Sequence, residues 1–176
     1  MRVLVVAASR HGATEQIGAE IAKTLRITLS SGVQSAIVDL RSADQVTTIA
    51  GYDGVVLGSA VYMGRWLAAA REFADRHAGA LAAIPVWLFS SGPIGDPPKP
   101  DQDPADVAAI AAATGAREHR RFAGELDRHR LGFAERAVIR AVHAPEGDFR
   151  DWPAIRDWAT EIALTLLAQP ATTGSG

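Results

Sequence analysis

Residues 8–14 read ASRHGAT and follow directly after the apolar run VLVVA, so hydroxyl groups come where a buried strand gives way to the next element. Ser9 and Thr14 offer hydroxyls, and Gly12 allows a tight turn. When such a turn opens a helix, the free backbone amides and the partial positive charge attract an anion such as a phosphate. Two interpretations are open at this point: the loop binds one phosphate through neutral donors, or Ser9 and Thr14 cap the helix.

The same loop excludes several kinds of nucleotide site. It has no lysine, so it is not the P-loop of a triphosphate site, and it lacks the G-x-G-x-x-G pattern of a dinucleotide site. A phospho-acceptor receiver domain would need paired acids after the first strand and an aspartate after the third. This chain has Ala7, Ala8 and Ser9 at the first place and Ser59 at the second. A monophosphate is therefore the simplest ligand for this loop.

The elements that must position this loop alternate between strands and helices. Segment 2–8 is a valine-rich apolar run, typical of a parallel strand covered on both faces, and apolar residues recur at helical spacing from Ala13 to Leu29. Further strands are expected at 35–40, 52–60, 84–92 and 119–126, and further helices at 66–78, 104–116 and 151–168. This alternation predicts βαβ units around a parallel sheet, an α/β three-layer sandwich.

Capping signals mark two of these helices. Pro104 is expected to open the helix at 104–116 and Gly115 to close it. Asp151 is the expected N-cap of the last helix, which Pro170 stops. Polar loops follow the first, third and fourth strands, at the strand ends where open parallel sheets bind ligands. These loops read SRHGAT, SAVYMGRW and SSGPIGD.

The composition fits a single globular domain. With 176 residues, 48% of them hydrophobic, the chain is expected to form one domain over 1–170, followed by a small polar tail at 171–176 that we expect to be disordered. The absence of cysteine excludes disulfides and thiolate metal sites. Without a signal peptide or membrane span, a cytoplasmic location is expected. The net charge of −2 argues against a broad nucleic-acid footprint.

Together these segments resemble a flavodoxin-fold FMN protein, and more closely the protoporphyrinogen IX dehydrogenase (menaquinone) family. SRHGAT matches the family's FMN-phosphate loop, and VVLGSAVYMGRW matches the strand and loop beside the isoalloxazine ring. HRRFAGELDRHRLGFAERAVIRAV, followed by FRDWPAIRDWATEIA, resembles that family's last strand, inserted segment and final helix. The resemblance implies a flavodoxin-like fold with a five-stranded parallel sheet in the order 2-1-3-4-5, and FMN as the cofactor.

The resemblance also implies roles for the three loops. Tyr62 is the expected stacking partner of the flavin ring, because an aromatic face suits a planar ring, whereas Trp66 is expected to pack in the core. No side chain is assigned a catalytic role, and His119, an isolated histidine beside two arginines, is left out of the site. The expected FMN-binding residues are Ser9, Arg10, His11, Gly12, Ala13 and Thr14 in the first loop, Ser59, Ala60, Val61, Tyr62, Met63 and Gly64 in the second, and Ser90, Ser91 and Gly92 in the third.

Two functions follow from this resemblance. The first is an FMN-dependent dehydrogenase that oxidises protoporphyrinogen IX with a quinone acceptor. The second is a flavodoxin-type electron-transfer protein whose partners are redox proteins and which has no small-molecule substrate of its own. The mild net charge and the insertion at 125–147 argue against the carrier, because carriers rely on strong charge for steering. A domain that has lost its flavin and only mediates contacts is a third interpretation.

Segment 127–143 is a candidate membrane contact. Its apolar residues Leu131, Ala134, Val138 and Val142 fall on one face of a helix, and its arginines lie away from that face. A basic amphipathic helix of this kind can lie on an anionic membrane. Because the apolar residues are small and acidic residues dilute the charge, packing on the sheet is the preferred interpretation. We therefore expect at most weak peripheral contact with the inner face of the membrane.

Overall fold

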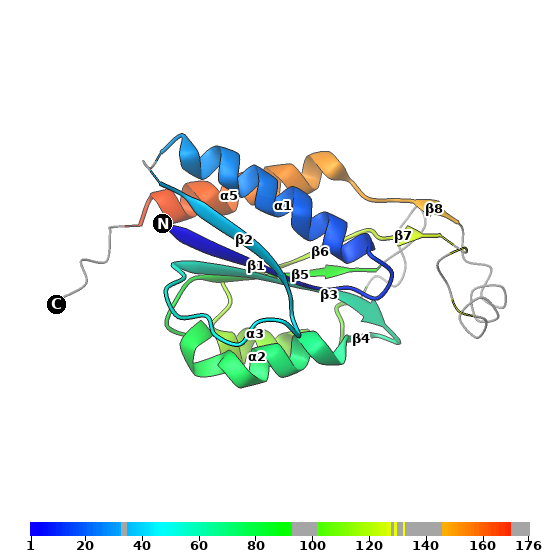
Figure 1. The fold of residues 1–176 in the computed structure, drawn as a ribbon. Coiled ribbons are helices and arrows are strands. Elements are labelled where there is room, and N and C mark those ends of the chain that lie inside the picture. The colour runs from blue at the N-terminus through cyan, green and yellow to red at the C-terminus, as the bar shows by residue number, and fades with distance from the viewer. Residues whose placement is uncertain (33–34, 93–101, 128, 130–131, 133–145, 170–176) are drawn as a thin grey trace.

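The core of the molecule is a parallel sheet. The computed structural model describes residues 1–32, 35–92, 102–127, 129, 132 and 146–169. Its parallel strands are β1 (Arg2–Ala8), β2 (Ile37–Ser42), β3 (Gly54–Tyr62), β5 (Val86–Ser91) and β6 (Glu118–Phe122). They lie in the order β2-β1-β3-β5-β6 (Figure 1). Counted over these strands alone, this is the order 2-1-3-4-5, so the predicted fold class and topology are confirmed.

Helices cover both faces of this sheet. One face carries α1 (Ala13–Ser30) and α5 (Trp152–Leu167), and the other carries α2 (Ala68–Leu81) and α3 (Val107–Thr114) (Figure 1). Each face has its own hydrophobic cluster. Val3 and Val5 belong to the cluster beneath α1 and α5, whereas Leu4 and Val6 belong to the one beneath α2 and α3. Because β1 packs on both sides, it needs an uninterrupted apolar run.

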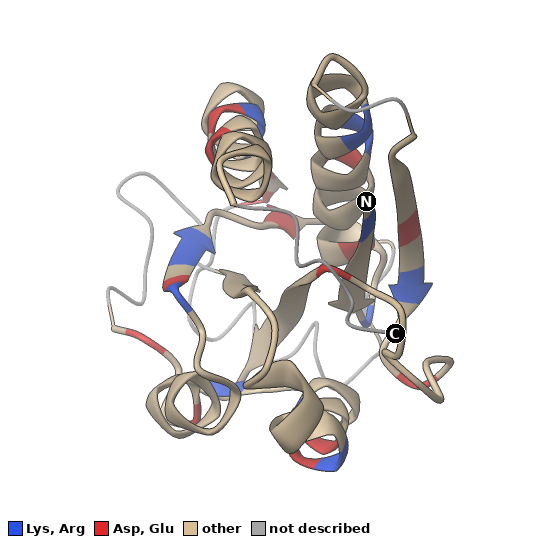
Figure 2. Ribbon diagram, turned by 90° about the vertical axis from the view of Figure 1, so that its left-hand side faces the viewer, with Lys and Arg blue, Asp and Glu red and all other residues tan. Residues whose placement is uncertain are grey.

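Most charged residues of the five parallel strands lie on the two edge strands (Figure 2). β2 carries Asp39 and Arg41, and β6 carries Glu118, Arg120 and Arg121, whereas β3 and β5 contain no charged residue. A strand covered on both faces has no water to solvate a charge, while an edge strand keeps one flank near solvent. Apart from Arg2 at the first position of β1, the charged residues of the parallel strands therefore mark the two edges of the sheet.

The helix ends confirm two capping signals. The Oδ1 of Asp151 accepts a hydrogen bond from the Ala154 amide at 3.0 Å, which makes Asp151 the N-cap of α5. Gly115 follows the last residue of α3 with φ at 63°, a left-handed conformation that glycine adopts readily. Both residues act where their types predicted.

Several predicted boundaries need correction. The helix predicted over 66–78 starts at Ala68, because Trp66 belongs to a short strand, β4 (Arg65–Trp66), which pairs antiparallel with the end of β3. The helix predicted over 104–116 starts at Val107, because the residues before it form a turn in which the Val107 amide donates to the Pro104 carbonyl at 3.1 Å. β2 runs two residues past the predicted 35–40, since it follows the register of β1.

The strand predicted over 119–126 is two separate strands. β6 ends at Phe122, opposite Ser91, where its partner β5 also ends, so no backbone remains for it to pair with. The chain then enters β7 (Glu125–Leu126), which pairs antiparallel with β8 (Gly147–Asp148) in a second small sheet. The pairing of β7 with the distant β8, and not the residues between 119 and 126, determines where the predicted strand divides.

Some predictions fall outside the described residues. These are nearly all of the amphipathic helix over 127–143 and the tail at 171–176, and they stay predictions. Among the helices of the described ranges, none combines the length and apolar character that crossing a membrane requires.

Candidate functional site

The three predicted loops begin side by side at the carboxyl edge of the sheet. In the strand registers Ala8 lies opposite Ser59, and Ser59 lies opposite Ser90. β1 continues into α1 on one face of the sheet, whereas β3 leads through β4 to α2 on the other face (Figure 1). The connections diverge between β1 and β3, and open α/β sheets bind ligands at such a point.

The first loop leaves the start of α1 without a side-chain cap. Gly12 is the N-cap residue, with φ at 91°, and the first helical hydrogen bond runs from the Gln16 amide to the Gly12 carbonyl at 3.0 Å. Ser9 Oγ accepts from the Gly12 amide at 3.0 Å, so this hydroxyl closes the loop and does not cap the helix. Thr14 is buried in the first turn. The amides of the first turn have no acceptor within the helix and are suited to an anion.

The second loop is a tight hairpin between β3 and β4. Its two turn residues, Met63 and Gly64, have φ angles of 51° and 74°, as a primed hairpin turn requires. Tyr62 is 45% exposed and Met63 is 87% exposed at its tip. The guanidinium carbon of Arg10 lies 4.8 Å from the centre of the Tyr62 ring. This cation–π contact brings the first and second loops together.

Behind its exposed tip the hairpin is firmly attached to the core. Trp66 is 2% exposed, which confirms that it packs in the core. Both carboxylate oxygens of Asp106 accept from the Trp66 amide at 3.2 Å, and Ser59 Oγ accepts from the Leu67 amide at 3.0 Å. The Ala105 amide donates to the Gly64 carbonyl at 3.0 Å. The hairpin is thus held against the start of α3.

In the part of the third loop that the structure describes, the side chains of Ser90 and Ser91 are buried. Ser90 is fully buried, and its Oγ accepts from Trp66 Nε1 at 2.7 Å and lies 2.8 Å from His119 Nε2. Ser91 is also buried, and Gly92 packs so closely on Val61 that a Cβ would lie 3.2 Å from the Val61 Cβ. The Ser90 hydroxyl is therefore used inside the protein, which leaves the backbone groups of residues 90–92 to face a ligand.

His119 joins this region although sequence reasoning left it out of the site. Burial lowers the pKa of the His119 imidazole, an effect that the charge of Asp103 opposes. The alternation along β5 could have predicted the direction of Ser90. Its side chain lies on the same face as Val86 and Leu88, which points toward α2 and α3. No residue close to Ser90 in the sequence indicated that β6 would place His119 beside it.

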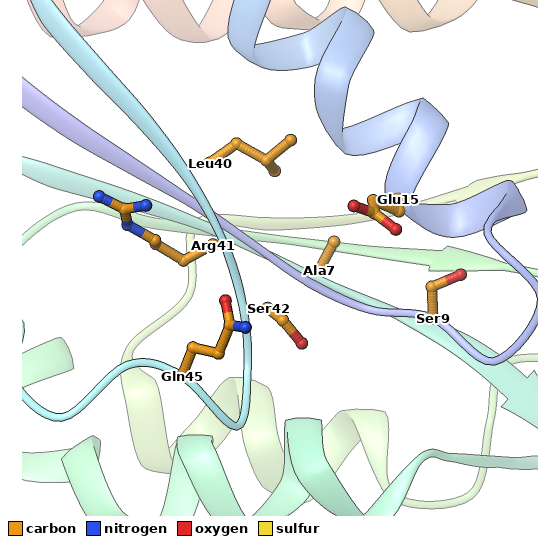
Figure 3. A pocket seen from close by; sticks show the side chains of 7 residues that line it. All are labelled: Ala7, Ser9, Glu15, Leu40, Arg41, Ser42 and Gln45. Atoms are coloured by element: carbon orange, nitrogen blue, oxygen red, sulfur yellow. The ribbon is translucent and has the colours of Figure 1, made fainter.

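A pocket of about 330 Å³ opens on the β2 side of the first loop (Figure 3). Its lining is mostly polar and comes from the ends of β1 and β2, the loop after β2 and the start of α1. The lining residues are Ala7, Ser9, Glu15, Leu40, Arg41, Ser42 and Gln45. Ser9 alone is shared with the predicted site. Sequence reasoning missed this hollow because the ends of β1 and β2 are far apart in the sequence and come together only through the pairing of the two strands.

A family model for the flavodoxin domain matches residues 4–152 of the chain. The chain belongs to the flavodoxin domain family. Solved structures agree with this fold. A flavodoxin from the domain Archaea aligns with a TM-score of 0.63 at 14% identity, over 94% of this chain and 99% of that one. An oxidoreductase from Corynebacterium diphtheriae aligns with a TM-score of 0.61 at 16% identity, over 97% and 99% of the two chains.

One group of curated relatives matches this flavodoxin domain along nearly its full length. Protoporphyrinogen IX dehydrogenase (quinone) of Escherichia coli strain K12 is 23% identical over 178 residues, covering 93% of this chain and 95% of the relative. Flavodoxin-like proteins are flavoproteins of oxidoreduction and electron transfer. That coarse assignment holds for this flavodoxin domain.

The flavodoxin family implies a flavin cofactor, FMN, and the residues at the carboxyl edge fit it. The start of α1 has no side-chain cap, so its amides are available to a phosphate. Tyr62 presents an exposed aromatic ring on the neighbouring hairpin, where a planar ring can stack. Because the Ser90 hydroxyl is engaged by Trp66 and His119, the fit of the third loop rests on its backbone.

Proposed function

We propose that the chain is an FMN-dependent oxidoreductase that oxidises protoporphyrinogen IX and passes the electrons to a quinone. This proposal depends on two features that lie together at the carboxyl edge of the sheet, where the connections after β1 and β3 diverge. These are the uncapped start of α1 and the exposed Tyr62 ring, and Arg10 lies 4.8 Å from that ring. Bound FMN would supply hydride-accepting chemistry. The name of the E. coli relative supports the choice of substrate and acceptor.

Each loop has its own part in the proposed site. The first-turn amides, including those of Ala13 and Thr14, hold the phosphate, while Ser9 keeps the loop closed through the Gly12 amide. Arg10 and His11 flank the phosphate. Tyr62 stacks on the ring, and the backbones of the second and third loops line its polar edge. The proposed residues of these two loops are Ser59, Ala60, Val61, Met63, Gly64, Ser90, Ser91 and Gly92.

The proposed enzyme works in the cytoplasm and reaches a lipid-soluble quinone through weak contact with the inner face of the membrane. Segment 127–143 is the candidate for that contact, because its sequence combines an apolar face with arginines. Binding to anionic vesicles at low salt that disappears when 127–143 is deleted would support this contact.

The test of the proposed function has two stages. In the first, the purified full chain is titrated with FMN, FAD and riboflavin, and the visible absorption bands are followed. We expect FMN to bind most tightly, because riboflavin lacks the phosphate. In the second, the FMN-loaded chain is mixed with protoporphyrinogen IX and a soluble menaquinone analogue. Formation of protoporphyrin supports the proposal, whereas FMN binding without protoporphyrin formation overturns the assigned substrate.

Electron transfer between proteins is the second candidate function. The exposed Met63 beside Tyr62 at the tip of the hairpin favours it, since exposed apolar side chains commonly mark a contact with another protein. For this function the FMN-loaded chain would be reduced by a flavodoxin reductase and would pass the electrons to an acceptor protein. Protoporphyrinogen IX would then not be oxidised, which separates the two candidates.

A further inference from the structure

Four side chains lie in series behind the β3–β4 hairpin, three of them joined by hydrogen bonds and the fourth by an ion-pair contact. Trp66 Nε1 donates to Ser90 Oγ at 2.7 Å, Ser90 Oγ lies 2.8 Å from His119 Nε2, and His119 Nδ1 lies 3.5 Å from Asp103 Oδ1. Trp66 and Ser90 are buried, the His119 side chain is 10% exposed and the Asp103 side chain is 62% exposed. This series of contacts therefore runs from the core to the surface.

The indole fixes the direction of the first hydrogen bond, and the tautomer of His119 determines the direction of the second. An indole nitrogen only donates, so Ser90 Oγ accepts from Trp66. In the neutral His119 tautomer that carries its proton on Nδ1, Ser90 donates its own proton to Nε2. His119 Nε2 is then the acceptor, and the imidazole proton lies on Nδ1, facing the Asp103 carboxylate. This arrangement requires the neutral imidazole. Burial also favours the neutral form, since it lowers the pKa of His119.

The order Asp103, His119, Ser90 has the composition of a hydrolase triad, but the geometry excludes that chemistry. Ser90 is 0% exposed, so a substrate carbonyl cannot reach its Oγ. Proton transfer toward a cofactor is excluded as well, because this series of contacts ends at the Trp66 indole, which cannot accept a proton. The remaining role of these side chains is to hold a neighbouring element in place.

The element held in place is the β3–β4 hairpin. Asp106 and Ser59 bind the backbone just after its turn, at Trp66 and Leu67, whereas Ser90 binds the Trp66 indole. Trp66 pairs with Val61, and the next pair toward the tip joins Arg65 to Tyr62. The position of the indole therefore sets the position of the Tyr62 ring.

We propose that neutral His119 is a positioning residue for the β3–β4 hairpin, and through it for the stacking of Tyr62 on FMN. The first part depends only on the contacts around Trp66, Ser90 and His119. The second part rests on the proposed function.

Protonation of His119 reverses one bond of this network. The Nε2 atom then carries a hydrogen that points at the Ser90 hydroxyl, and Ser90 must turn its own proton away. The charged groups around the ring are Asp103, which precedes α3, and Glu118 and Arg121 on β6; the two acids favour protonation and Arg121 opposes it. Acid is therefore expected to loosen the hairpin.

The effect of His119 on folding has the same sign. Its pKa in the folded chain lies below the ordinary value of 6.5, so the unfolded chain takes up the proton first. The free energy of unfolding should fall as the pH drops through that ordinary value, and this loss should level off below the folded-state pKa. The measurement is urea unfolding as a function of pH, with His119→Gln as the variant that does not titrate.

The test of the positioning role follows the Trp66 indole resonance by NMR between about pH 8 and 5, the range in which histidine titrates. A Trp66→Phe variant assigns the resonance. In the wild-type chain we expect it to shift as His119 titrates. In His119→Gln, where an amide oxygen can still accept from Ser90, it should stay at the neutral position. In His119→Phe, where the acceptor is lost, it should shift at every pH.

FMN affinity provides the second measurement. His119→Phe should weaken FMN binding by about tenfold, the effect of one lost buried hydrogen bond, while His119→Gln should bind FMN as the wild type does. His77→Phe is the matched control. It replaces another partly buried histidine, on α2, whose ring packs against Phe73 with the ring centres 4.9 Å apart, and it should change neither the indole resonance nor the affinity.

The outcomes separate this inference from the proposed function. If the chemical shift of the Trp66 indole changes neither with pH nor in His119→Phe, the positioning role is wrong. A resonance that responds as expected in a chain that does not bind FMN supports the role in the hairpin and overturns the proposed function. Wild-type and His119→Phe chains that bind FMN equally well overturn the link between His119 and the cofactor.

Discussion

At the scale of single residues, Gly12 is where the first loop turns. Its φ of 91° lies in the left-handed region, and the amides proposed to hold the phosphate follow it directly. We expect Gly12→Ala to lower the free energy of unfolding by about 1–2 kcal/mol, because a side chain is strained there. FMN binding should weaken by roughly tenfold, as for one lost hydrogen bond to a charged group, and riboflavin binding should change less. Flavin titrations measure both dissociation constants.

Gly51→Ala is the control for this prediction. Gly51 also has a positive φ, 82°, and a Cβ there would meet nothing within 4 Å, so the strain is similar. It lies just before β3, at the opposite end of the strand from the hairpin. Gly51→Ala should lose similar stability and keep its FMN affinity. If Gly12→Ala weakened FMN and riboflavin binding equally, the amides after Gly12 would not be the phosphate site.

Tyr62 is the residue proposed to stack on the flavin ring. Stacking on an aromatic ring disfavours the electron-rich reduced flavin, so Tyr62→Ala should raise the reduction potential and shift the visible bands. Tyr62→Phe keeps an aromatic face and should leave both near the wild-type values. Spectra and a potentiometric titration check this. An unchanged spectrum and potential in Tyr62→Ala would remove stacking from the proposal, because Trp66 is buried and cannot take its place.

At the scale of elements, the packing of β3 against β5 depends on Gly58. Gly58 lies opposite Phe89 in the register, and a Cβ added to it would overlap with the Phe89 ring. Gly58→Ala is therefore expected to lower the free energy of unfolding by about 2–3 kcal/mol through overpacking, measured by urea unfolding.

The control for Gly58 lies in α2. A Cβ at Gly79 would meet nothing within 4 Å, so Gly79→Ala should raise stability by up to about 1 kcal/mol, because alanine favours a helix. Wild-type stability in Gly58→Ala would mean that the Phe89 ring turns aside at little cost, and the close approach would then not constrain the sheet.

Elements with a local signal could be predicted from the sequence. The apolar run of β1, Asp151 before α5 and Gly115 after α3 each act through their own neighbours, and the structure confirms them. Elements that depend on a distant partner were missed. β4 forms because Met63 and Gly64 turn the chain back on β3, and β7 forms because β8 pairs with it from about twenty residues away.

The candidate site divides in the same way. The three loops could be predicted, because parallel strands end at one edge and the registers bring Ala8, Ser59 and Ser90 together. The direction of the side chains could not be inferred from residue type alone. Serine suits both a ligand and the core, and only the placement of Trp66 and His119 shows that the Ser90 hydroxyl is engaged.

At the scale of the whole molecule, Arg150 joins segments that are far apart in the sequence. Its side chain is 4% exposed and makes two hydrogen bonds of 2.7 Å with Asp148, one of 2.7 Å with Gln16 in α1, and an ion pair of 3.3 Å with Glu125 in β7. Arg150→Ala removes these charge-assisted hydrogen bonds, so we expect the free energy of unfolding to fall by about 1.5–3 kcal/mol.

Arg156→Ala is the matched control for Arg150. Arg156 is 46% exposed and pairs with Glu20 of α1 at 3.4 Å, so its loss should cost about 1 kcal/mol or less. Urea unfolding of both variants tests the difference. Equal effects would mean that the contacts of Arg150 contribute no more than a surface ion pair does.

The start of β1 and the end of α5 lie at the edge of the sheet opposite the three loops (Figure 1). β1 has seven residues, which at about 3.3 Å each separates the two edges by roughly 20 Å. A linker joined to the first residue would therefore tether the protein to a solid support with the loops directed into solution. On an electrode, that orientation would place the proposed flavin far from the metal and leave it open to soluble mediators, whereas attachment through Met63 at the hairpin tip would bring it close.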